Sequence, residues 1–151
     1  MITQKASRFR ALSWPERRIL FAALLLLPLF AIGLRSLGFA QFQARLDRPP
    51  RKATTAASVP DPTAIGRLVN AAARHSPGTI TCLTRSMLLR WLLGRRGIAS
   101  ELRIGVRIVE GKLDAHAWVE HAGAPINDTP DVASRYAAFG EAISLEAFSA
   151  P

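Results

Sequence analysis

The sequence predicts an α+β domain in which the helices come first and a small antiparallel sheet follows. An apolar run with helical character occupies about residues 14–39, and helical spacing of apolar residues resumes over 63–75 and 81–95. From residue 98 onward the spacing changes to a period of two, and glycine-containing turns separate three strand candidates. Because consecutive strands joined by tight turns pair antiparallel, we expect a meander packed against helices.

The 151 residues favour one domain with an N-terminal extension. We expect a basic N-terminus with the apolar helix in residues 1–46, a linker rich in Pro, Ala and Thr in 47–62, and the main domain in 63–151. The charge is uneven, since residues 1–52 hold ten basic and two acidic residues, whereas 53–151 hold ten basic and nine acidic residues. The net charge of +9 therefore belongs almost wholly to the first third of the chain.

The most apolar stretch is Ile19–Leu34, sixteen uncharged residues with Arg17 and Arg18 before it and Arg35 after it. Three interpretations are open. A signal peptide would need a small-residue cleavage site, and none follows convincingly. A membrane span would need about 20 apolar residues. We favour a helix that lies on a membrane, on a partner or against the rest of the protein, with a kink at Pro28.

The chain has a single cysteine, Cys82, which excludes an internal disulfide and is a poor basis for a structural zinc site. A free thiol fits a reducing compartment, so we expect a cytoplasmic protein, with peripheral membrane contact through residues 14–39 as an option. No pattern of basic and aromatic residues indicates nucleic-acid binding. We expect no metal ion and no directly bound cofactor.

Cys82 is also the first candidate for chemistry, because it lies at the predicted start of a helix. Unpaired N–H groups and the helix dipole favour a thiolate there, and the same N–H groups could hold an oxyanion. His116 lies on a predicted strand, and Asp128 lies on the next short strand, where it could reach the outer nitrogen of His116. Taken singly, the three have ordinary interpretations: a buried cysteine, a satisfied histidine and a turn aspartate. Together they predict a nucleophile, a base and a group that orients the base, in the papain-like and transglutaminase-like order.

Two more side chains are candidates for contact with a substrate. Trp118 shares a strand face with His116, and both would face a cleft if the opposite face, with Ala117 and Val119, packs on the core. Arg85 follows Cys82 by three residues and could contact a substrate or a partner. A solvated helix face is the more ordinary role for such an arginine.

Three motifs together resemble those of the lasso-peptide leader peptidases, which are the peptidase part of the split B protein. The motifs are Cys82-Leu83-x-Arg85-Ser86, Ala115-His116-Ala117-Trp118-Val119-Glu120 and Asn127-Asp128. They are also similar to the C-terminal domain of the microcin-processing B protein. The resemblance covers about residues 63–130, and Trp14-Pro15-Glu16-Arg17-Arg18 before a leucine run resembles the extension of such proteins.

The resemblance implies a transglutaminase-like cysteine peptidase in which Cys82 is the nucleophile, His116 the general base and acid, and Asp128 its orienting partner. It implies that the enzyme removes the leader from a ribosomally made lasso precursor peptide. A separate leader-recognition protein and a ring-forming cyclase would be its partners. Any ATP dependence would come through the cyclase, because the sequence has no phosphate-binding loop. Two alternatives remain: an acyltransferase with the same triad, and a non-catalytic scaffold of a membrane-associated maturation complex.

Overall fold

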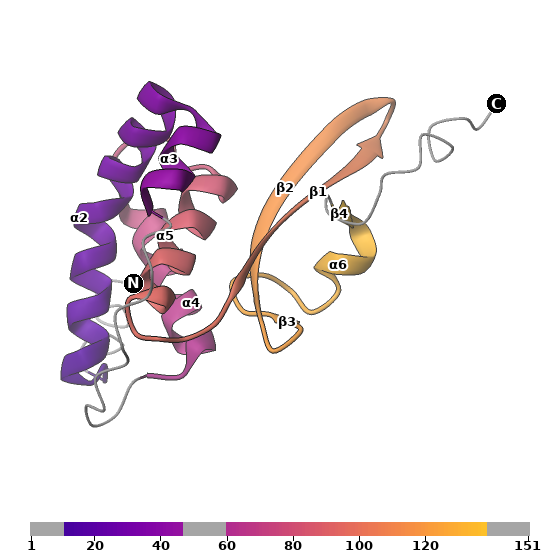
Figure 1. The fold of residues 1–151 in the computed structure, drawn as a ribbon. Coiled ribbons are helices and arrows are strands. Elements are labelled where there is room, and N and C mark those ends of the chain that lie inside the picture. The colour runs from indigo at the N-terminus through magenta and orange to yellow at the C-terminus, as the bar shows by residue number, and fades with distance from the viewer. Residues whose placement is uncertain (1–10, 47–59, 139–151) are drawn as a thin grey trace, which may run out of the picture.

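The computed structural model describes residues 11–46 and 60–138, which form a group of helices beside a curled antiparallel sheet (Figure 1). The helices are α2 (Trp14–Leu37), α3 (Phe39–Leu46), α4 (Pro62–His75), α5 (Cys82–Gly94) and the short α6 (Val132–Arg135). The strands are β1 (Glu101–Val109), β2 (Lys112–His121), β3 (Ala124–Pro125) and β4 (Ala137–Ala138), in the order β3-β2-β1-β4. The predicted α+β fold, with an apolar helix before the sheet, is confirmed.

The long apolar helix α2 is part of the main hydrophobic core. It begins at a capping box, in which the N–H of Glu16 donates to Ser13 Oγ while the N–H of Ser13 donates to the Glu16 carboxylate. It continues through Pro28 to Leu37. Its buried face packs on α4 and α5 and consists of Ile19, Ala23, Leu27 and Phe30. The division expected at residues 46 and 63 therefore does not separate two hydrophobic cores, and most of the expected linker, 47–59, lies outside the described residues.

Helices α4 and α5 each begin at a residue whose side chain caps the first turn. Asp61 accepts a hydrogen bond from the N–H of Ala64, and Thr81 accepts one from the N–H of Thr84. α5 is covered by α2 and α4 on one side and by the sheet on the other. Its buried residues therefore extend beyond a single stripe: they are Thr84, Ser86, Met87, Leu88, Leu89, Leu92 and Leu93.

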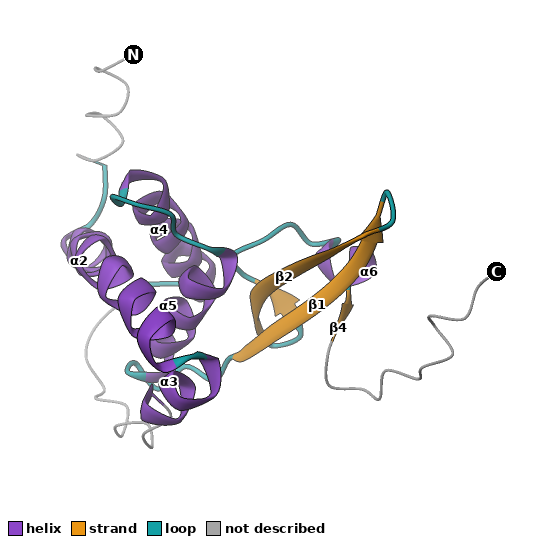
Figure 2. Cartoon of the chain, turned by 90° about the horizontal axis from the view of Figure 1, so that it is seen from above, coloured by secondary structure: helices purple, strands orange, loops and turns teal. Residues whose placement is uncertain are grey.

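The strands are joined by two tight turns in which both central residues have positive φ, as a type I′ turn requires. In Glu110-Gly111 the φ angles are 51° and 74°, and in Ala122-Gly123 they are 50° and 77°. β2 begins at Lys112, directly after the first turn, so His116 lies near the middle of the strand. The hairpin extends beyond the helices (Figure 2), and Ile108 near its tip is 62% exposed.

The end of the described chain differs from the prediction. β3 is only Ala124–Pro125, so Asp128 lies in the loop that follows rather than on a strand. The segment after this loop forms α6 and then β4, which pairs with β1 at Gly105 and Val106. The chain thus crosses from one edge of the sheet to the other, and this crossing brings Asp128 and Tyr136 to His116.

Candidate active site

Cys82 is the first residue of α5, and its side chain is half-buried. Thr81 caps the N–H of Thr84, while the N–H groups of Cys82 and Leu83 make no hydrogen bond within the described part of the chain. Two free donors and the positive end of the helix dipole therefore surround the thiol. Such surroundings can stabilise the oxyanion of an acyl-transfer intermediate.

The side chains of His116 and Asp128 are in close contact. His116 Nε2 lies 2.6 Å from Asp128 Oδ2, and the two side chains are 19% and 16% exposed. The other carboxylate oxygen accepts a hydrogen bond from the N–H of Thr129 and lies 3.6 Å from the guanidinium of Arg135. Burial acts to raise the pKa of Asp128, but the hydrogen bonds from His116 and Thr129 outweigh it, so that the pKa is lowered. The carboxylate is therefore ionised at neutral pH.

An ionised Asp128 fixes the state of the imidazole. The carboxylate accepts a hydrogen bond from Nε2–H of His116. In the neutral imidazole Nδ1 then carries no proton and has a lone pair. Nδ1 is thus the nitrogen able to take a proton from a thiol. No hydrogen bond joins Cys82 to His116 or Asp128 among the described residues, so the structure brings the base and its orienting group together and places the thiol on the neighbouring helix.

A buried polar network ties that helix to the strand and the loop that carry the other two residues. Ser86, one turn after Cys82 on α5, donates to the carbonyl of Ala117 at 3.0 Å and accepts from Asn127 Nδ2 at 3.0 Å. Asn127 Oδ1 accepts from the N–H of Val119 at 2.8 Å. Because Ala117 follows His116 and Asn127 precedes Asp128, this network sets the position of both relative to α5.

A fourth element joins the network from α4. Asn70 Nδ2 donates to the carbonyl of Asn127 at 2.8 Å. Gly66, one turn earlier, lies so close to Ile126 that a Cβ at this position would collide with the Ile126 carbonyl oxygen. Ser86 and Asn127 were predicted only as members of motifs, and no role was predicted for Gly66 or Asn70. Gly66, Asn70 and Ser86 could have been found as small or polar residues on otherwise apolar helix faces.

Tyr136 packs on His116, although no functional role was predicted for it. The ring centroids are 5.0 Å apart, and Tyr136 Oη donates to Asp114 Oδ2 at 3.0 Å. Arg107 Nε donates to the same oxygen at 2.7 Å, and its guanidinium lies 4.5 Å from the Tyr136 ring centroid. Gly105, opposite His116 in the sheet, leaves room for this ring, since a Cβ there would come within 2.8 Å of Tyr136 Cβ.

The structure does not support the substrate contact predicted for Trp118. Ala117 and Val119 pack on the core as expected, but Trp118 is fully buried as well, beneath Val132 and Tyr136. Its Nε1 donates to Glu120 at 2.9 Å. The crossing segment covers this face of the sheet, and Trp118 stacks beside His116 with the ring centroids 6.2 Å apart.

Arg85 stays a candidate for substrate contact. It is half-buried on α5, one turn after Cys82, and its Nε is buried without a hydrogen-bond partner in the described part of the chain. A buried donor without a partner is costly unless a ligand or water supplies the acceptor.

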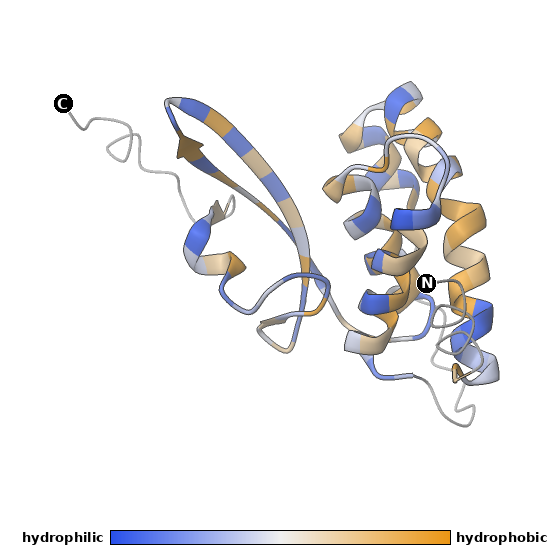
Figure 3. Cartoon of the chain, turned by 180° about the vertical axis from the view of Figure 1, so that it is seen from behind, coloured by the Kyte–Doolittle hydropathy of each residue, from blue (hydrophilic) through white to orange (hydrophobic). Residues whose placement is uncertain are grey.

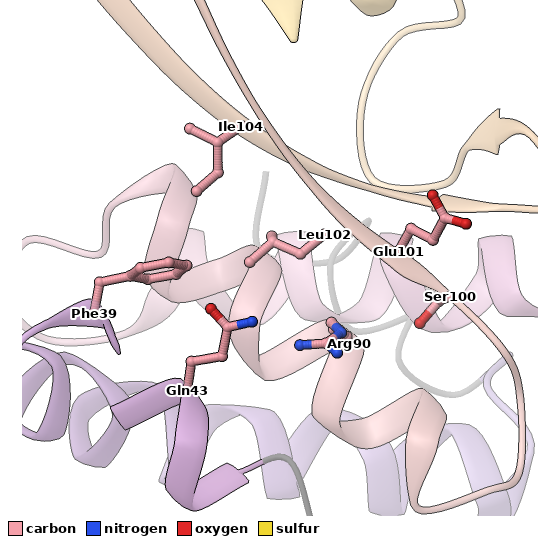
Figure 4. Close-up of a pocket in the computed structure, with 7 residues that line it drawn as sticks. All are labelled: Phe39, Gln43, Arg90, Ser100, Glu101, Leu102 and Ile104. Atoms are coloured by element: carbon pink, nitrogen blue, oxygen red, sulfur yellow. The ribbon is translucent and has the colours of Figure 1, made fainter. Parts of the chain in front are cut away.

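A pocket of about 340 Å³ lies elsewhere, between α3, α5 and the start of β1 (Figure 4). Its lining residues are Phe39, Gln43, Arg90, Ser100, Glu101, Leu102 and Ile104. Because the lining includes neither Cys82 nor His116, we do not assign the chemistry to this pocket. Within the described ranges, no group of three His, Cys, Asp or Glu side chains is arranged to hold a metal ion.

The family model of the transglutaminase-like superfamily matches residues 23–140, and the chain belongs to this superfamily. The match begins inside α2 and includes Cys82, His116 and Asp128. It therefore agrees with the packing of α2 into the main core. No curated protein and no solved structure matches the chain significantly.

Proposed function

We propose that the protein is a cysteine peptidase in which Cys82, His116 and Asp128 form the catalytic triad. The observation that carries this proposal is the 2.6 Å contact between His116 Nε2 and Asp128, which leaves Nδ1 of His116 as a base. The free N–H groups at the start of α5, where Cys82 lies, support it. Membership of a superfamily that includes cysteine peptidases and acyltransferases supports it further.

The chemistry proceeds by acyl transfer. His116 Nδ1 takes the thiol proton, and the Cys82 thiolate attacks the carbonyl carbon of the scissile peptide bond. The N–H groups at the start of α5 stabilise the oxyanion. The C–N bond then breaks, His116 protonates the leaving amine, and a thioester with Cys82 remains. Water attacks the thioester, gives its proton to His116, and releases the carboxylate product and the thiol.

The substrate we propose is the leader region of a ribosomally made lasso precursor peptide. The support is the combination of Cys82-Leu83-x-Arg85-Ser86 with Ala115-His116-Ala117-Trp118-Val119-Glu120 and Asn127-Asp128. A separate leader-recognition protein would present the precursor, and a cyclase would close the ring afterwards. Any dependence on ATP would arise in the cyclase.

The decisive experiment is a cleavage assay read by mass spectrometry, with a candidate precursor, its recognition protein and either wild-type protein or Cys82→Ala. We expect leader release by the wild type only, with circular dichroism showing an unchanged fold for the variant. Equal cleavage by both proteins would contradict thiol catalysis and favour a scaffold.

The same assay separates hydrolysis from acyl transfer to an amine. A leader fragment that ends in a free carboxylate indicates a peptidase. A fragment that carries an added amine, when one is supplied, indicates an acyltransferase. A measurement that needs no substrate complements it: the rate of Cys82 alkylation by iodoacetamide should exceed that of an unperturbed thiol at neutral pH, and His116→Ala should lower this rate.

A further inference from the structure

Helix α2 has a second apolar face, which points away from the core. Figure 3 shows α2 apolar along most of its length, with polar residues at its N-terminal end. The exposed face carries an apolar stripe, which we define as Phe21, Leu25, Leu29 and Ile32; these side chains are 53%, 73%, 60% and 61% exposed. They are spaced three or four residues apart and so lie on one side of the helix.

Arginines bracket the apolar stripe on the same face. Arg18 is three residues before Phe21, Arg35 is three residues after Ile32, and both are exposed. At 1.5 Å per residue the two lie about 25 Å apart along the helix axis. Trp14, four residues before Arg18, extends the face and is 72% exposed. Along its length the face therefore carries an aromatic residue, a cation, the apolar stripe and a second cation.

The positive charge at the N-terminal end of this face has no ion-pair partner among the described residues. Arg18 and Arg95 both lie near Arg96, and no carboxylate forms an ion pair with any of the three in that part of the chain. Burial lowers the pKa of Arg96, and the positive charges of Arg95 and Arg18 lower it further. Like charges held together in this way favour an anionic ligand.

We propose that this face of α2 binds the surface of an anionic lipid bilayer, with the helix axis in the membrane plane. The apolar stripe would enter between the headgroups, and Arg18 and Arg35 would contact lipid phosphates. The length and composition of α2 would also permit a span. A span, however, would remove Ile19, Ala23, Leu27 and Phe30 from the core, whereas surface binding leaves them in place.

The charge pattern disfavours a second copy of the chain on this face. In a parallel pair of stripes Arg18 would meet Arg18, and in an antiparallel pair it would meet Arg35. Like charges would face one another at both ends in either arrangement. Lipid phosphates, in contrast, offer negative charge at both ends of the stripe at once.

The test is co-sedimentation of the full-length protein with two kinds of vesicle, one of phosphatidylcholine alone and one with about one-third phosphatidylglycerol. We expect stronger binding to the anionic vesicles, weakened by salt. Replacing Arg18 and Arg35 by Gln should reduce binding about fivefold for each charge removed. The triple variant Leu25→Ser, Leu29→Ser, Ile32→Ser should reduce it at least about tenfold.

The matched control is Leu113→Ser, because Leu113 is 66% exposed but lies on β2. It should bind vesicles like the wild type. Trp14 provides a second readout: its emission should shift to the blue on binding. Trp14→Phe should remove the shift, since Trp118 is already fully buried and Trp91 is packed between Phe30 and Arg95.

Equal binding to both vesicle types, or an equal loss with Leu113→Ser, would overturn the proposal. So would a dimer in light scattering that the triple variant dissociates, because the face would then be a contact between copies of the chain. The vesicle experiment uses no peptide substrate. Its outcome is therefore independent of the proposed peptidase activity.

Discussion

His116 Nε2 lies 2.6 Å from Asp128 Oδ2, although the two residues come from a strand and from a loop beyond the next turn. This relationship assigns the imidazole nitrogens their roles. Loss of the Asp128 carboxylate should therefore lower the rate of catalysis without changing the fold.

Asp128→Asn should lower peptide cleavage by about 10²–10⁴-fold, because a neutral amide no longer stabilises the imidazolium or selects its tautomer. The variant should stay folded, since the network through Asn127 remains. Cleavage rates at saturating precursor, beside circular dichroism spectra, provide the check. Asp131→Asn is the control, because that carboxylate is exposed and pairs with Arg135 instead. A similar loss in both variants would contradict the role given to Asp128.

The pH dependence of stability follows from the same pair. The pKa of folded Asp128 is lowered below the value of about 3.9 for an unfolded aspartate. The ionised carboxylate therefore stabilises the fold above that value, and this contribution is lost as the pH falls through the folded pKa. As the pH is lowered from neutral to about 3, the melting temperature should fall more steeply for the wild type than for Asp128→Asn. If the melting temperatures of the two proteins fall in parallel, the lowered pKa of Asp128 is contradicted.

Ser86→Ala should destabilise the protein by about 1–3 kcal/mol, because it leaves Asn127 Nδ2 and the Ala117 carbonyl buried without a partner. Urea unfolding measures the change. Ser134→Ala is the matched control, since Ser134 also donates to a backbone carbonyl but is exposed. Its effect should stay within about 0.5 kcal/mol.

Gly66→Ala should displace the loop before Asp128, because the new Cβ would collide with the Ile126 carbonyl. We expect lower cleavage activity as well as lower stability. Gly94→Ala, at the end of α5, meets open space and should be neutral or stabilising by up to about 1 kcal/mol. Equal melting temperatures and activities for the two variants would show that α4 does not position this loop.

Two leucines of α2 separate its buried face from its exposed face. Leu27 is fully buried, whereas Leu25 is 73% exposed. Leu27→Ala should cost about 2–5 kcal/mol in the free energy of unfolding. Leu25→Ala should change it by less than about 0.5 kcal/mol. Equal losses of stability in the two variants would contradict this assignment of the buried and exposed faces of α2.

Local patterns in the sequence were enough to predict the helix that begins at Cys82 and the strand that carries His116, because capping residues and alternating apolar residues act over a few positions. Trp118 could not be placed in the same way. Its burial depends on Tyr136, which reaches the sheet through a four-residue helix and a two-residue strand. Elements of this length have almost no local signal and form by pairing with distant residues.

The packing of α2 was equally hidden from the sequence. Its apolar residues surround the helix, so periodicity could not tell which side meets α4. The polar network was also missed. A hydrogen bond such as that between Asn70 and Asn127 joins residues 57 positions apart, and no spacing rule covers that distance.

The residues between α5 and β1 divide the candidate triad between two segments of chain. The thiol lies before the turn at Gly97, and the imidazole and the carboxylate lie after it. A chain cut in this connection would yield one fragment with the nucleophile and another with the base. Neither fragment could catalyse alone, and activity would return only where the two reassemble, as in a split reporter of their association.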